Sequence, residues 1–250
     1  MSGHSKWSTI KRKKGVADAK RGQIFTKVIK ELTVAAKEGG GDESANPRLR
    51  SAISTAKSVN MPASNIEKAI KKGTGELPGI VYEEASYEGY GPGGAALLIH
   101  ALTDNKNRTV SEIRHLLTKH DGSLAGPGSV AWQFEAKGLL TIRKEIVSED
   151  DLFSIVVDAG ADDMTVEGDV YEVITSPENF ENVKSALNDS NIRFESAELT
   201  QIPNTTKDID GSDARKLLQL MEQLENHEDV QNVFSNFDID EKILEEMATV

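Results

Sequence analysis

Residues 164–175 read MTVEGDVYEVIT, two runs of strand-favouring residues on either side of Gly168-Asp169. A glycine-containing pair between two such runs is typical of a tight β-hairpin. The flanking segments extend the hairpin to the order strand, helix, strand, strand, helix, strand, with the outer elements expected at 139–143, 148–159, 176–187 and 192–202. This is the order of the ferredoxin-like split unit, so the sequence predicts an α+β domain over 139–203.

The segments on either side of 139–203 together predict a second ferredoxin-like α+β domain, into which the first is inserted. Its strands and helices are expected at 84–90, 95–102, 104–117, 130–136, 214–224 and 230–237. The strand at 130–136 would carry Trp132 and Phe134 on one face, because alternate residues of a strand point the same way. The interrupted domain is therefore expected at 79–138 plus 204–250.

The N-terminal region predicts three helices. Apolar residues recur with helical spacing over 24–36, and three consecutive glycines end this first helix. Asn46-Pro47 is typical of a capped helix start, and Met61-Pro62 opens a third, shorter helix that Gly73 closes. Together with a basic tail, these helices form the domain expected at 1–78.

Charge is distributed unevenly along the chain. Residues 1–75 contain 16 Lys+Arg and 6 Asp+Glu, a net charge of +10, and residues 76–250 contain the other 13 basic and 35 acidic residues, a net charge of -22, which together give the -12 of the whole chain. A basic part on an acidic body is typical of a protein that binds a polyanion with that part alone. We therefore expect nucleic acid as the partner of the N-terminal domain, and proteins as a second class of partner for the acidic α+β domains.

The segment GHSKWSTIKRKKG at 3–15 contains no acidic residue and one Trp. Phosphates neutralise such cations and an unpaired base can stack on an indole, so the segment suits nucleic acid. Two alternatives stay open: a solvated terminus without a role, or a Trp7 that packs back onto the helices. The residues expected to bind nucleic acid are Lys6, Trp7, Lys11, Arg12, Lys13, Lys14, Lys20, Arg21 and Lys27.

A second candidate site lies where a helix is expected to follow the strand at 95–102. Asn105, Lys106, Asn107 and Arg108 place two cations beside the backbone N–H groups of a helix start, where an anion can bind. An ordinary capped β-to-α turn is the favoured interpretation of the same residues.

The sequence offers little for catalysis or metal binding. The chain contains no Cys, which excludes disulfides, thiolate catalysis and Cys-based zinc sites. Its 5 His are scattered, and Glu112 with His115 lacks the further ligands of a di-iron site. We therefore expect a protein that is not an enzyme, with no catalytic residues, no cofactor and no metal. No run of residues approaches the ~20 apolar residues of a membrane span, so we expect a cytoplasmic protein that does not bind membranes.

Four long stretches of the chain resemble one family. They are GHSKWSTIKRKKGVADAKRGQIFTKVIKELTVAAKEGG, NMPASNIEKAIKKG, YEGYGPGGAALLIHALTDNKNRT and GSLAGPGSVAWQFE. These are similar to the signature segments of the YebC/PmpR family, also called the TACO family for its mitochondrial members. The resemblance implies three domains, the first helical and the other two α+β, and a non-enzymatic role in gene expression.

The same resemblance leaves the nucleic acid open. Family members are widely labelled probable transcriptional regulators that bind DNA, the mitochondrial members are translational activators, and some bacterial members resemble ribosome-associated factors that relieve stalling at proline runs. The sequence shows no obvious helix-turn-helix, because the joints GGGDESAN and VNMP do not look like the short turn of that motif. We expect a translation factor that binds ribosomal RNA, with a transcriptional regulator that binds promoter DNA as the alternative.

Overall fold

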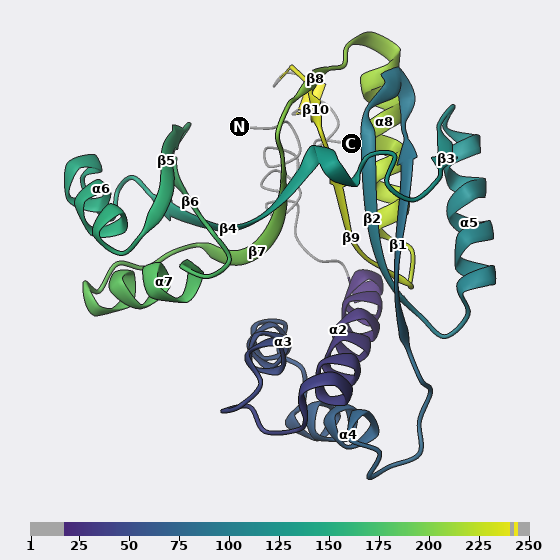
Figure 1. The fold of residues 1–250 in the computed structure, drawn as a ribbon, viewed down its shortest axis with the longest axis horizontal. Helices are drawn as coiled ribbons and strands as arrows, with labels where there is room; N and C mark the ends of the chain where they lie inside the picture. Colours follow the sequence, from purple (N-terminus) through teal and green to yellow (C-terminus); the bar gives the residue numbers. More distant parts are fainter. Residues whose placement is uncertain (1–17, 241–242, 245–250) are drawn as a thin grey trace. The chain divides into compact units, whose positions relative to one another are not determined.

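The computed structural model describes residues 18–240, 243 and 244, with the backbone alone for 18–20. These residues fall into two compact units (Figure 1). Residues 132–206 make up the inserted unit, and the described residues before and after them make up the main unit. Each unit contains a four-stranded antiparallel sheet, which confirms the α+β class. The N-terminal helices belong to the main unit, so a division into three domains stays a prediction.

The inserted unit has the element order expected from its sequence. It consists of β4 (Phe134–Arg143), α6 (Glu149–Asp158), β5 (Ala161–Glu167), β6 (Val170–Thr175), α7 (Phe180–Asp189) and β7 (Ser196–Pro203), with the strand order β5-β6-β4-β7. Glu167 pairs with Val170 across the turn, where Gly168 has a φ of 53°, a conformation that favours glycine. The expected hairpin and the ferredoxin-like order are therefore confirmed.

The main unit contains the second sheet, in the strand order β3-β1-β2-β9. Its elements are β1 (Glu83–Tyr90), η1 (Pro92–Gly94), β2 (Ala96–Thr103), α5 (Lys106–Lys119), β3 (Ser123–Ala125), then, after the inserted unit, β8 (Lys207–Asp208), α8 (Gly211–Glu225), β9 (Val230–Ser235) and β10 (Phe237–Asp238). The core joins Leu97 and Ile99 of β2 to Ile113 of α5 and to Leu217 and Met221 of α8. Chain segments before and after the insertion therefore share one core.

The prediction of a strand over 130–136 is wrong for residues 130–133. Residues 131–133 form a short 3-10 turn, η2 (Ala131–Gln133), and Phe134 already begins β4. Trp132 is 72% exposed whereas Phe134 is 8% exposed, so the two side chains do not share a face.

A buried carboxylate explains this local structure. Glu88 of β1 accepts hydrogen bonds from the backbone N–H groups of Gly128, Val130 and Ala131 at 2.6, 2.6 and 2.9 Å. Burial by itself would raise the pKa of Glu88, but these backbone donors outweigh it and hold the pKa below its ordinary value. N–H groups bound to this carboxylate are not available to a strand ladder.

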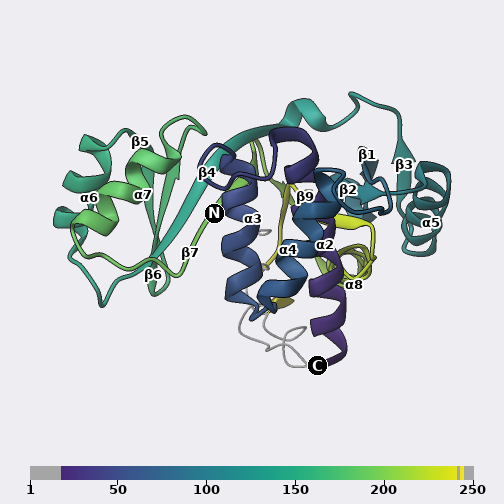
Figure 2. The same ribbon diagram turned by 90° about the horizontal axis from the view of Figure 1, so that it is seen from below.

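Three helices form the N-terminal part of the main unit, as expected, and residues 18–73 are called the head below. They are α2 (Asp18–Gly39), α3 (Pro47–Ser58) and α4 (Ala63–Gly73), and α3 and α4 both pack on α2 (Figure 2). The Asn46 side chain accepts the N–H of Leu49 and so caps α3. The head core contains Leu32, Leu49, Ile53, Ala56, Ile66 and Ala69. Among the described residues, no helix combines the length and the apolar character that crossing a membrane requires.

Gly73 allows α4 to approach α2 closely, so we predict that a side chain there destabilises the head. A Cβ at this position would lie 2.3 Å from the carbonyl oxygen of Thr33 and 2.8 Å from the Cβ of Ala36. Gly73→Ala should lower the free energy of unfolding by about 1–3 kcal/mol, because the helices must move apart. Urea denaturation followed by circular dichroism measures this change.

Gly22 provides the matched control on α2. A Cβ at Gly22 meets nothing within 4 Å. Gly22→Ala should therefore raise the free energy of unfolding by roughly 0.5–1 kcal/mol, since alanine is the better helix former. A Gly73→Ala variant as stable as the parent chain would show that α2 and α4 are not in close contact.

Candidate nucleic-acid interface

Most of the residues expected to bind nucleic acid lie near the N-terminus. Lys6, Trp7, Lys11, Arg12, Lys13 and Lys14 are outside the described residues, and so is the side chain of Lys20. Arg21 is exposed near the start of α2.

Lys27 and Lys30 point toward the turn between α8 and β9. Lys27 Nζ donates to the carbonyl oxygen of Glu225 at 2.6 Å, and Lys30 Nζ donates to that of Glu228 at 3.1 Å. Cations are favourable at the C-terminal end of a helix, where carbonyl groups lack helical partners. Lys27 thus has a structural contact, and its expected contact with nucleic acid stays a prediction.

Asp229, in this turn, is the centre of a buried ion cluster. Its Oδ1 lies 2.5 Å from Lys30 Nζ, and its Oδ2 lies 2.7 Å from a terminal guanidinium nitrogen of Arg108. The hydroxyl groups of Thr109 and Thr103 donate to Oδ2 at 2.7 and 3.3 Å. Asp229 is 2% exposed and Lys30 is 6% exposed. These five residues are called the ion cluster, and they connect α2 to β2, to α5 and to the turn before β9.

The ion cluster keeps the carboxylate charged despite its burial. Burial by itself would raise the pKa of Asp229, but hydrogen bonds from Lys30, Arg108 and Thr109 outweigh this effect and hold the pKa far below its ordinary value. Removal of one partner would leave a buried charge uncompensated, which is much more costly than the loss of an exposed ion pair.

The second candidate site is a capped helix start in the structure. The Asn105 side chain accepts the N–H of Arg108 at 3.1 Å and so caps α5. Lys106 forms an ion pair with Glu83 at 2.8 Å, and Arg108 contacts both Asp104 and Asp229. The chain's own carboxylates therefore contact both cations, and the binding of a separate anion by Asn105, Lys106, Asn107 and Arg108 stays a prediction.

A cleft of about 900 Å³ lies beside the ion cluster, within the main unit. It is lined by Thr26, Lys30, Tyr82, Asp104, Arg108, Ser111, Glu112, His115, Leu116, Asn226, His227, Glu228 and Asp229. The sequence did not indicate this cleft, because its walls come from α2, α5 and the turn after α8.

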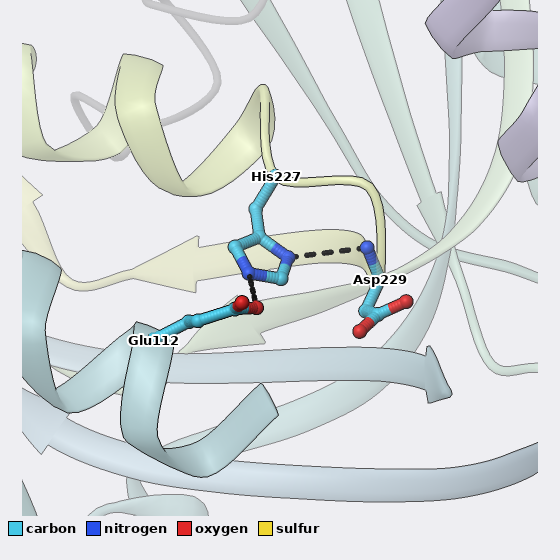
Figure 3. Close-up of side chains that lie close together, drawn as sticks. All are labelled: Glu112, His227 and Asp229. Carbon is cyan, nitrogen blue, oxygen red and sulfur yellow. Dashed lines mark hydrogen bonds and ion pairs between the residues drawn. The ribbon is translucent and has the colours of Figure 1, made fainter. Parts of the chain in front are cut away.

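Glu112, His227 and Asp229 have side-chain ligand atoms within 4.8 Å of one another in this cleft. Figure 3 shows the imidazole of His227 between the Glu112 carboxylate and the backbone nitrogen of Asp229. The Asp229 N–H donates to His227 Nδ1 at 3.1 Å, which assigns the ring hydrogen to Nε2, and Nε2 then donates to Glu112 Oε2 at 2.9 Å. The imidazole is therefore part of a hydrogen-bond network.

This donor set does not fit a metal ion. A histidine that ligates a metal with one ring nitrogen ordinarily donates through the other, whereas Nδ1 of His227 accepts a hydrogen bond. Both carboxylate oxygens of Asp229 already face Lys30 or Arg108, which would repel a cation. Glu112, His227 and Asp229 are better explained as residues that hold the turn between α8 and β9 in place.

The head also has cations on its surface that the site prediction did not name. Arg50 and Lys57 of α3 and Lys68, Lys71 and Lys72 of α4 are exposed. Helical spacing contained this signal on α4, because Ile66, Ala69 and Ile70 face the head core and the lysines occupy other positions of the helix. Arg48, in contrast, contacts Glu31, Glu38 and Glu84.

Two family models match the chain. The model described as the TACO1/YebC protein N-terminal domain matches residues 5–76, and the model described as the TACO1/YebC second and third domain matches residues 82–237. The chain belongs to the TACO1/YebC family. The resemblance drawn from the sequence is thereby confirmed.

Similar proteins match the chain over nearly its full length. A probable transcriptional regulatory protein of Geobacter sp. (strain M21) is 56% identical over 247 residues, which cover 99% of this chain and 100% of the relative. A probable transcriptional regulatory protein of Dictyoglomus thermophilum is 53% identical over 249 residues, which cover 99% of this chain and 100% of the relative. The crystal structure of a conserved hypothetical protein from Aquifex aeolicus has a TM-score of 0.82 and 46% identity, and the match covers 91% of this chain and 94% of that one.

The ion cluster gives a prediction for stability. Asp229→Ala should lower the free energy of unfolding at neutral pH by about 3–5 kcal/mol, because it leaves Lys30 buried without its counterion. Lys216→Ala removes an ion pair with Asp121 whose side chains are 45% and 67% exposed, and should cost about 1 kcal/mol or less. Urea denaturation of both variants measures these differences.

The difference in unfolding free energy between the parent chain and Asp229→Ala should depend on pH. The folded pKa of Asp229 is lowered, so its stabilisation is present above the unfolded pKa of about 3.9 and is lost as the pH falls below it. The gap between the parent chain and Asp229→Ala should therefore narrow below about pH 4. A difference in unfolding free energy of under about 1 kcal/mol at neutral pH, which is the range of an exposed ion pair, would contradict the described cluster. A difference that widens in acid would contradict it too.

Proposed function

We propose that the chain is a non-enzymatic regulator of gene expression that binds nucleic acid through its N-terminal region. The observation that carries this proposal is the separation of charge, with a net of +10 in residues 1–75 and -22 in residues 76–250. Lys and Arg that neutralise phosphates release counterions, which supplies much of the affinity for any nucleic acid. The acidic remainder would be repelled by the same polymer.

The contacts of the head support this assignment. Lys27, Lys30 and Arg48 interact with the body or with carboxylates of the head, whereas exposed cations lie on α3 and α4. The exposed set, Arg50, Lys57, Lys68, Lys71 and Lys72, extends the basic character of the tail onto a folded surface. Exposed ammonium and guanidinium groups on short helices suit phosphate contacts without base specificity.

We further propose that the nucleic acid is ribosomal RNA. The segment at 3–15 interleaves cations with Trp7 and contains no acidic residue, which suits a partner with both phosphates and unpaired bases. Translation is also a role that the family resemblance implies for the mitochondrial members. The acidic α+β units would then face proteins or solvent.

Promoter DNA is the second candidate, and two observations favour it. The similar proteins of Geobacter and Dictyoglomus are named probable transcriptional regulatory proteins. The joint between α3 and α4 consists of Val59–Pro62, which is within the 3–4 residues of a helix-turn-helix turn, and Asn60 in it has a φ of 57°.

A non-enzymatic role is supported by the cleft. Its most buried titratable groups, Lys30 and Asp229, interact with each other and with Arg108, and His227 bridges Glu112 to the backbone. Groups held in ion pairs and hydrogen bonds of this kind are poorly suited to act as a general acid, base or nucleophile. The cleft residues therefore support a structural role.

Ribosome co-sedimentation tests the proposal. The full chain should sediment with ribosomes at moderate salt, and a chain that lacks residues 1–15 should lose most of this binding. The affinity that remains for single-stranded RNA should depend less on salt. In a plot of the logarithm of the binding constant against the logarithm of the salt concentration, the slope should become shallower by ~0.7 for each phosphate that the shortened chain no longer neutralises. Lys119→Gln, which removes an exposed cation from α5 of the acidic body, should change neither quantity.

Genome-wide DNA crosslinking in the same cells distinguishes the two candidates. Discrete promoter peaks together with no ribosome-bound fraction would show that the target is DNA. Equal binding of RNA and DNA by the truncated and the full chain would show that the basic tail is not the binding site.

A further inference from the structure

The inserted unit is strongly acidic. Residues 132–206 contain 5 Lys+Arg and 16 Asp+Glu, a net charge of -11. Helix α6 contributes four of these carboxylates and contains no Lys or Arg. A surface of this charge repels nucleic acid and attracts cationic partners.

The two helices of the inserted unit differ in what they expose. Helices α6 and α7 pack against each other, and both contribute to the core on one face of the sheet (Figure 2). The exposed residues of α7 are all polar, namely Glu181, Asn182, Ser185, Asn188 and Asp189. The exposed side of α6, in contrast, includes two large apolar residues, Phe153 and Val157.

These two residues form a second apolar stripe on α6. Leu152 and Val156 are fully buried in the core of the unit, whereas Phe153 is 52% exposed and Val157 is 48% exposed. Residues four apart are neighbours on the surface of a helix, so Phe153 and Val157 adjoin each other, and they are called the α6 stripe. A single exposed apolar residue is ordinary, but adjoining ones with a polar rim are typical of an interaction surface.

Three exposed carboxylates flank the α6 stripe. Glu149 and Asp150 lie within one helical turn before it, and Asp158 directly follows it. Within the described part of the chain, no ion pair involves any of these three side chains. The cations Arg143 and Lys184 of the same unit pair with carboxylates outside α6. The rim of the stripe is therefore available to cations of a partner.

An apolar stripe with a rim of carboxylates selects a partner that has both apolar and cationic groups. Nucleic acid and the anionic surface of a membrane would be repelled by the carboxylates. A protein segment with Lys or Arg beside apolar residues would cover the stripe and pair with the rim. This is the ordinary arrangement of a protein interface, in which aromatic residues are enriched at the core and polar groups surround it.

We propose that the α6 stripe and its rim are a docking surface for a basic amphipathic segment of another protein. Apolar side chains of that segment cover Phe153 and Val157, and its Lys or Arg residues pair with Glu149, Asp150 and Asp158. The surface is independent of the nucleic acid proposed for the N-terminal region, so either proposal can fail without the other.

A labelled synthetic peptide tests this surface in the full chain. The probe is an amphipathic helical peptide of Leu and Lys that carries fluorescein, and its anisotropy should rise to saturation as the chain is added at moderate salt. A peptide with Glu in place of Lys loses the charge complementarity, and one with Ser in place of Leu loses the apolar contact. Both should bind much more weakly.

Variants of α6 locate the bound peptide. Phe153→Gln should weaken its binding by roughly 5- to 30-fold, the range for loss of one anchor residue at an interface, while circular dichroism shows the chain folded. Asp150→Asn combined with Asp158→Asn should weaken binding and also reduce its salt dependence. The matched controls are Leu199→Gln, at a position 61% exposed on β7, and Asp189→Asn at the exposed end of α7. Both should leave the affinity unchanged.

Four outcomes would overturn the inference. The first is no binding of the Leu–Lys peptide, or equal affinity in Phe153→Gln and the parent chain. A dimer in sedimentation analysis that Phe153→Gln dissociates would show that a second copy of the chain covers the stripe. Tighter peptide binding by a chain that lacks residues 1–15 would show that the chain's own basic segment is the occupant. A loss of RNA affinity in Phe153→Gln, measured with labelled RNA, would show that the stripe contacts nucleic acid.

Discussion

The Asp229 carboxylate is the group on which the arrangement of the main unit depends. It lies in the turn before β9, and it accepts hydrogen bonds from Lys30 of the head and from Arg108 and Thr109 of α5. A buried ion pair of this kind need not stabilise a fold more than apolar residues would, but it tolerates few alternative arrangements, since each misplaced partner leaves a buried charge. The cluster therefore specifies how the head joins the sheet.

This constraint also determines which cations of the head remain available to a ligand. Lys27 and Lys30 contact the turn after α8, whereas Lys68, Lys71 and Lys72 are exposed on α4. These described cations of the head are thus divided between an internal joint and an external surface. A polyanion bound by that surface would be connected to the acidic body through packed helices and the ion cluster.

Sequence patterns predicted the features that depend on nearby residues. The hairpin at 164–175 and the cap of Asn46 on α3 are local, and the insertion follows from the order of the elements. The prediction of a strand over 130–136 failed at its start because the carboxylate of Glu88, some 40 residues away in sequence, binds backbone N–H groups there. Contacts such as that of Lys30 with Asp229, 199 residues apart, leave no signal in a single sequence.

The central claim is that the ion cluster holds the head and the main sheet as one body, and a distance measurement between them tests it most directly. The chain contains no Cys, so spin labels can be attached at Ser54→Cys on α3 and Lys119→Cys on α5, both exposed positions. Double electron–electron resonance should give one narrow distance distribution, which should broaden on Asp229→Asn while circular dichroism shows both chains folded. A distribution that is already broad in the parent chain, or that Asp229→Asn leaves unchanged, would contradict the account.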